Sequence, residues 1–112
     1  MSSGEAVVAW VNAKERFDTA RESLQQIGKQ VFVTGERLAD RRWRDLHPAG
    51  EPYIQGYPTG NSEFEANKWP TGEQIREALK VCHQAYRDLL KAFNALPQKE
   101  KKTLNLDRQP EP

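Results

Sequence analysis

The 112-residue sequence contains a single cysteine, Cys82, and no long run of apolar residues. One cysteine cannot form a disulfide within the chain, and a free thiol is typical of a reducing compartment. The longest early apolar run, Ala6 to Val11, is far shorter than the roughly 20 residues that a membrane-spanning helix needs. From these absences we expect a cytoplasmic protein that does not associate with membranes.

The sequence also lacks an excess of charge of either sign and has few residues suited to catalysis or metal binding. Its 17 basic and 16 acidic residues leave a formal net charge of +1, unlike a strongly basic nucleic-acid coat. The only histidines, His47 and His83, do not form a metal-binding spacing. Cys82 and His83 are adjacent, so on a helix they point about 100° apart and cannot form a catalytic pair. We therefore expect no enzymatic activity, no metal and no cofactor.

The first predicted helix covers residues 5–46 and is defined by a repeat of seven residues. Large apolar side chains recur at this interval, and a second row, mostly of alanine, is offset from them by three residues. A strand would alternate every two residues, so the spacing indicates the two rows of a helical seam. The large row consists of Trp10, Phe17, Leu24, Val31 and Leu38, and the second row of Ala6, Ala13, Ala20 and Ile27.

A second predicted helix covers residues 72–96. Thr71, followed three residues later by Gln74, is typical of a capping box at a helix start, and Pro97 ends the pattern. Alanines again recur every seven residues, at Ala78, Ala85 and Ala92. We predict an all-α fold in which the two helices form a long antiparallel hairpin with closely spaced alanines. Residues 1–97 would form one domain, and residues 98–112 a short, charged, partly disordered tail.

Two glycines leave the continuity of the first helix open. Gly28 and Gly35 each cost about 1 kcal/mol relative to alanine inside a helix. Gly28 could therefore cap a shorter helix, with a second one starting near Gly35. The seven-residue repeat continues unshifted through both glycines, which favours one long helix that is bent at a glycine.

The connection between the helices, residues 47–70, is long and rich in proline, glycine and aromatic residues. Disordered segments are poor in aromatics, so we expect this loop to be ordered. It could form a lid over the exposed part of the first helix, or it could be a binding surface. As a lid it would cover Val31, Phe32, Leu38 and Trp43.

The residues most suited to binding lie at the end of the first helix and in this loop. Arginine and aromatic residues are enriched at the energetic centres of protein interfaces. We predict a protein–protein interaction module, whose partner is another protein or a second copy of the chain. The alternative is a nucleic-acid-associated protein that uses the Arg37–Arg44 cluster and the C-terminal lysines. The candidate partner-binding residues are Arg37, Arg41, Trp43, Arg44, Tyr53 and Tyr57.

Within the arginine cluster, the expected helix would also pair charges of opposite sign. Arg41 lies four residues before Asp45, and Asp40 lies four residues before Arg44. Residues four apart are neighbours on a helix surface, so we predict that both pairs form there. Such pairing would leave little net charge for phosphate binding.

Overall fold

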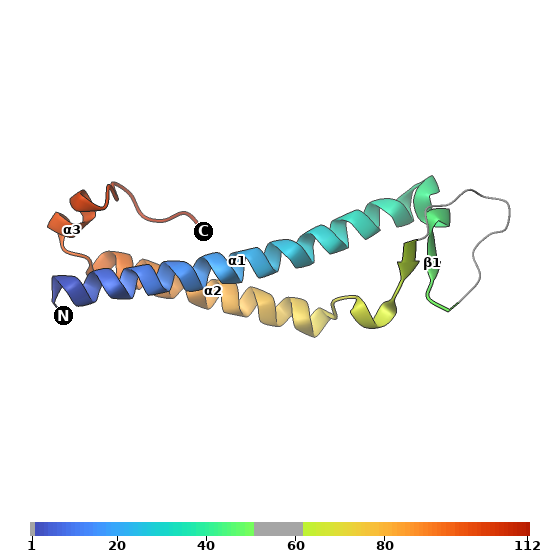
Figure 1. The fold of residues 1–112 in the computed structure, drawn as a ribbon, viewed down its shortest axis with the longest axis horizontal. Helices are drawn as coiled ribbons and strands as arrows, with labels where there is room; N and C mark the ends of the chain where they lie inside the picture. The colour runs from blue at the N-terminus through green and yellow to red at the C-terminus, as the bar shows by residue number, and fades with distance from the viewer. Residues whose placement is uncertain (1, 51–61) are drawn as a thin grey trace. The chain divides into compact units, whose positions relative to one another are not determined.

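The computed structural model describes residues 2–50 and 62–112, which form seven short or long elements (Figure 1). Two long helices dominate: α1 (Ser3–Ala39) and α2 (Gly72–Ala95). A shorter helix, α3 (Gln98–Thr103), follows them. Two 3-10 turns, η1 (Arg41–Asp45) and η2 (Ala66–Lys68), and two short strands, β1 (Leu46–Pro48) and β2 (Ser62–Phe64), lie between α1 and α2 in the sequence.

These elements form two compact units. The first contains residues 1–24 and 76–112, and the second contains residues 25–75. Two compact parts of a chain need not fold separately, so the single domain over residues 1–97 stays a prediction. The mainly helical structure confirms the predicted all-α class. The two short strands were not predicted.

In the first unit, α1 and α2 pack against each other through the predicted rows of large and small residues. Ala6 and Ala13 are almost completely buried, at 2% and 1% exposed. The alanines of the α2 row are buried at Ala85 and half-buried at Ala78 and Ala92. Alanine at these positions lets large neighbours fill the space between the helices. The core comprises Ala13, Phe17, Ala20, Cys82, Ala85 and Leu89, with Trp10, Leu24, Tyr86 and Ala92 packed against it.

The start of α2 is fixed by the predicted capping box. The backbone N–H of Gln74 donates to Thr71 Oγ1 at 3.1 Å, and the backbone N–H of Thr71 donates to Gln74 Oε1 at 2.9 Å. Each side chain thus satisfies a backbone group that the helix itself leaves unpaired. The helix ends at Ala95, one residue before the predicted end, and Pro97 precedes α3.

The end of α1 differs from the prediction. The helix runs through Gly28 and Gly35 without a break, but it stops at Ala39 rather than at residue 46. Asp40 adopts an extended conformation, and its carboxylate accepts a hydrogen bond from the backbone N–H of Arg42 at 2.8 Å. A short acidic side chain that bonds nearby backbone in this way competes with continuation of a helix. Residues 41–45 therefore form η1 instead of a further helical turn.

The second unit contains a feature that the sequence analysis did not predict. Strands β1 and β2 pair in parallel, with Leu46 opposite Ser62 and Pro48 opposite Phe64. The backbone N–H of Ala49 extends the pairing by donating to the carbonyl oxygen of Phe64 at 3.0 Å. The ring of Phe64 lies 5.6 Å from that of Trp69. The described parts of the connection, residues 47–50 and 62–70, thus have local structure.

The described part of the connection does not cover the end of α1 as a lid. Val31, Phe32, Leu38 and Trp43 are 38%, 64%, 62% and 55% exposed, so residues 47–50 and 62–70 do not cover them, and the rest of the predicted lid lies outside the described residues. The contact that does form is on another side of the helix, where Gln30 Nε2 donates to the carbonyl oxygen of Lys68 at 3.2 Å. Residues 51–61, to which the predicted binding residues Tyr53 and Tyr57 belong, lie outside the described part.

The C-terminal tail, which belongs to the first unit, contacts α2. The hydroxyl of Tyr86 donates to the carbonyl oxygen of Pro110 at 2.7 Å. The ammonium of Lys101 lies 4.5 Å from the centre of the Phe93 ring, a cation–π distance. The partial disorder of residues 98–112 stays a prediction.

Candidate functional site

Trp43 is the central side chain of the candidate site and lies on η1, directly after α1. Its side chain is 55% exposed, although tryptophan is usually well buried. The turn beneath it is fixed, because the backbone N–H of Trp43 donates to the carbonyl of Asp40 and its own carbonyl accepts from Leu46. The structure therefore presents a large aromatic side chain on a hydrogen-bonded turn.

Three predicted arginines belong to the same part of the chain. Arg37 is half-buried in the last turn of α1, Arg41 is exposed at the start of η1, and Arg44 is half-buried near its end. Because α1 ends at Ala39, Arg37 lies on α1 and the other two arginines lie on η1, so the three do not share one α-helix. The predicted helical pairs Arg41–Asp45 and Asp40–Arg44 likewise lose the helix on which they depended.

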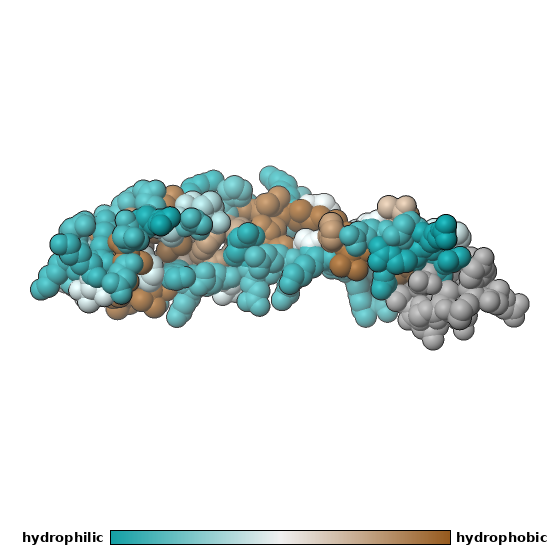
Figure 2. Space-filling model, turned by 90° about the horizontal axis from the view of Figure 1, so that it is seen from above, coloured by the Kyte–Doolittle hydropathy of each residue, from teal (hydrophilic) through white to brown (hydrophobic). Residues whose placement is uncertain are grey.

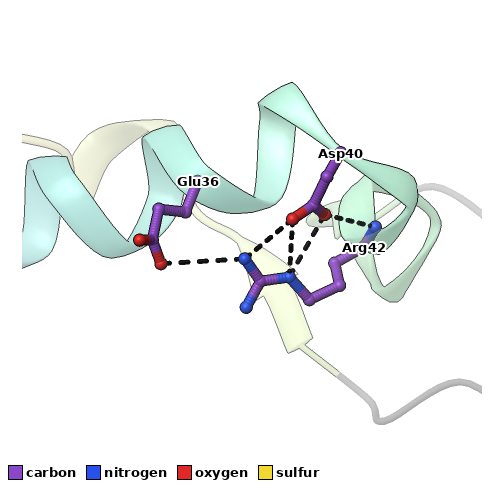
Figure 3. Close-up of polar contacts among 3 residues, drawn as sticks. All are labelled: Glu36, Asp40 and Arg42. Carbon is purple, nitrogen blue, oxygen red and sulfur yellow. Dashed lines mark hydrogen bonds and ion pairs between the residues drawn. The ribbon is translucent and has the colours of Figure 1, made fainter.

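A different arginine, Arg42, organises the charges of this turn (Figure 3). Its Nε lies 3.1 Å from both carboxylate oxygens of Asp40, and its Nη2 lies 2.8 Å from Asp40 Oδ2. Nη2 is also 3.7 Å from Glu36 Oε2, which connects the turn to the last part of α1. Forked contacts of this kind fix the relative orientation of guanidinium and carboxylate.

The pKa values of the pair reflect these contacts. The side-chain hydrogen bond from Arg42, followed by the hydrogen bond from its backbone, lowers the pKa of Asp40 below its ordinary value. The same side-chain hydrogen bond raises the pKa of Arg42. Both groups therefore stay charged at neutral pH, and the clamp between them weakens only in acid. Water screens both side chains, which are about half exposed.

Arg42 was not among the predicted binding residues, because a continuous helix was expected at this position. A signal for the observed turn is present, since aspartate is a favoured cap and is followed two residues later by the arginine. With Arg42 held by Asp40 and Glu36, Arg37 and Arg41 have no ion pair among the described residues. These two arginines, Trp43 and Arg44 belong to the last turn of α1 and to η1, and they are here called the Trp43 surface.

The first unit contains a cavity of about 290 Å³ with a mainly apolar lining. Trp10, Phe17, Leu89 and Phe93 contribute its apolar walls. Its charged lining residues have mixed sign, and one pair among them, Lys14 and Asp18, forms a 3.3 Å ion pair. The cavity is at the lower limit of the size usual for small-molecule sites. The indole Nε1 of Trp10 is buried and has no hydrogen-bond acceptor among the described residues.

Metal-binding clusters and membrane-spanning helices are absent from the described residues. In residues 2–50 and 62–112, no three His, Cys, Asp or Glu side chains are grouped so that they could hold a metal ion. No helix in these ranges combines the length and apolar character needed to cross a membrane. Comparison with protein-family models, with curated proteins and with solved structures found no match.

Proposed function

We propose that this protein is a non-enzymatic protein–protein interaction module, in the class of small adaptors, inhibitors or oligomeric scaffolds, and that it binds through the Trp43 surface. The observation that carries the proposal is the 55% exposure of Trp43 on a turn fixed by hydrogen bonds. Tryptophan and arginine are enriched among the few residues that supply most of the binding energy of an interface. Tyr53 and Tyr57 stay part of the proposed surface.

The Asp40–Arg42 clamp supports this proposal through preorganisation. A turn that is already ordered loses less conformational freedom when a partner binds, so more of the contact energy appears as affinity. The charges indicate the partner's chemistry, because Arg37 and Arg41 add positive charge to the same segment of the chain as Trp43. We expect an apolar pocket bordered by acidic side chains on the partner.

We also propose that α1 and α2 run antiparallel, as in a helical hairpin. Two observations in the first unit support this direction. The rings of Phe17 and Tyr86 are 5.3 Å apart, whereas Trp10, one heptad earlier, lines the same cavity as Phe93, one heptad later. The buried, free thiol of Cys82 supports the further proposal of a cytoplasmic location.

The proposal is tested by identifying partners of the immobilised protein and then measuring the affinity of purified pairs. Trp43→Ala should weaken the specific partner by about 30-fold, which corresponds to a loss of roughly 2 kcal/mol at an interface hot spot. Arg41→Ala should weaken it less. Val81→Ala is the matched control, since Val81 is 50% exposed on α2 in the first unit.

Salt and nuclease treatment separate the alternative function from this one. A complex that depends on nucleic acid should disappear with nuclease and weaken steeply as salt rises, because phosphate binding releases counterions. A partner that survives both treatments and is lost with Trp43→Ala supports the proposal. A partner that binds Trp43→Ala and the unmodified protein equally contradicts the proposed surface.

A further inference from the structure

A second surface is formed by one uncharged face of α1 in the second unit. Residues spaced by four, three and four positions share one side of a helix. At this spacing the face contains one large aromatic side chain among three small residues, and two branched apolar side chains lie along one edge. We call it the Phe32 face: Gly28, Phe32, Gly35 and Ala39, with Val31 and Leu38 at the edge.

The Phe32 face is open in the structure. Phe32 and Leu38 are 64% and 62% exposed, which is unusual for side chains of this size. Gln30, which contacts Lys68, points about 160° away from Phe32, given 3.6 residues per turn. The Phe32 face therefore lies on the side of α1 opposite this contact. Figure 2 shows hydrophobic side chains reaching the molecular surface among hydrophilic ones.

The two glycines provide depressions next to the exposed ring. Among the described residues, no atom beyond the helix's own turn lies within 4 Å of the place where a Cβ would stand at Gly28 or Gly35. The helix backbone is therefore accessible at both positions. A large side chain from another helix could enter there, as knobs enter holes between packed helices.

We propose that a second copy of this chain docks on the Phe32 face in antiparallel orientation. A two-fold axis between residues 32 and 35 places Phe32 of each copy over Gly35 of the other. The same axis brings Gly28 of each copy opposite Ala39 of the other. Each Phe32 ring thus meets a glycine, and the contact occurs twice, which is the self-complementarity that a two-fold dimer requires.

The charges along the other edge of the face select this orientation. Lys29 and Glu36 lie along it, one heptad apart. In the antiparallel dimer Lys29 of each copy approaches Glu36 of the other. Two ion pairs therefore form between the copies. A parallel dimer would instead place the charged edge of each copy against the apolar edge of the other, so Lys29 and Glu36 would lose their partners of opposite charge.

The remaining edge is apolar and fits the same orientation. Val31 of one copy meets Leu38 of the other, which covers side chains that are 38% and 62% exposed in the single chain. From Gly28 to Ala39 the face spans only about three helical turns. We therefore expect a weak dimer, with a dissociation constant on the order of micromolar or above.

Sedimentation equilibrium of the full chain from about 1 µM to 1 mM tests the dimer directly, because this range covers weak association. The unmodified protein should change from monomer to dimer within it. Phe32→Glu should raise the dissociation constant tenfold or more, which is the effect expected from the loss of one interface hot spot. Val33→Glu is the matched control, since Val33 is 49% exposed and lies outside the face.

A charge exchange tests the orientation. Lys29→Glu alone should weaken the dimer, whereas Lys29→Glu combined with Glu36→Lys should restore it. A monomer throughout the concentration range overturns the proposal, and so does a dimer that Phe32→Glu leaves unchanged. A double variant that stays as weak as the single one overturns the antiparallel pairing. Trp43→Ala should not affect dimerisation, so the dimer and the proposed Trp43 surface can fail independently.

Discussion

The two halves of α1 carry the same sequence repeat but differ in burial. In the first unit, Phe17 of the large row is only 7% exposed. In the second unit, Val31 and Leu38 continue this row at unchanged spacing and are 38% and 62% exposed. A heptad repeat thus identifies a helix face that is able to pack. Whether another element covers that face depends on which elements the fold supplies.

The lengths of the two helices explain why part of the row of large side chains on α1 is not covered by α2. α1 has 37 residues and α2 has 24, a difference of 13. At a rise of about 1.5 Å per residue, this difference corresponds to roughly 20 Å of helix. α2 alone is therefore too short to cover α1. The same type of substitution should therefore change the stability of the protein by different amounts in the two halves of α1 and the units they belong to.

The largest expected difference comes from removing one leucine side chain in each unit. Leu89 is 2% exposed in the core of the first unit, so Leu89→Ala should lower the free energy of unfolding by about 2–5 kcal/mol. Leu38→Ala should change it by less than about 0.5 kcal/mol, as is usual for surface positions. Urea denaturation at low protein concentration measures both, and equal losses would contradict the difference between the halves.

A smaller effect is expected from enlarging the alanines of the packed half. Ala13 and Ala85 are 1% and 8% exposed, so Ala13→Leu or Ala85→Leu should overpack the core and cost about 1–3 kcal/mol. Asn12→Leu is the control, because Asn12 precedes Ala13 on the same helix and is exposed. Thermal and urea unfolding would report the change. A neutral Ala13→Leu would mean that no helix packs closely at this position.

The parts of the fold that the sequence predicted are those encoded by local, periodic signals. The repeat of seven residues gave both long helices, and the Thr71–Gln74 pair gave the start of α2 to the residue. These signals depend on neighbours within one or two helical turns. They are therefore readable without knowledge of the rest of the structure.

The parts that were missed depend on competition or on distant partners. The end of α1 depends on whether Asp40 continues the helix or caps the next turn, and residues on both sides of it are good helix formers. The strands β1 and β2 contain three residues each, too few to show an alternating pattern. Their pairing joins residues 16 positions apart, such as Leu46 and Ser62.

The candidate site shows the same division. The composition around Trp43 was sufficient to propose an aromatic and cationic surface. The composition did not reveal the role of Arg42, because this role requires the carboxylates of Asp40 and Glu36 to meet around one guanidinium. Side-chain networks formed at a turn have no period, so only the geometry identifies their central residue.

The smallest expected effect tests the continuity of α1 where its two halves meet. Gly28 lies inside the helix, and a Cβ there would meet no described atom within 4 Å beyond the helix's own turn. Gly28→Ala should therefore stabilise the protein by up to about 1 kcal/mol, the usual difference in helix propensity. Urea denaturation at low concentration, where the proposed dimer is dissociated, provides the measurement. Gly4→Ala, in the first turn of α1, should change stability less, because helix ends fray. Marked destabilisation by Gly28→Ala would instead indicate a left-handed backbone and a broken helix.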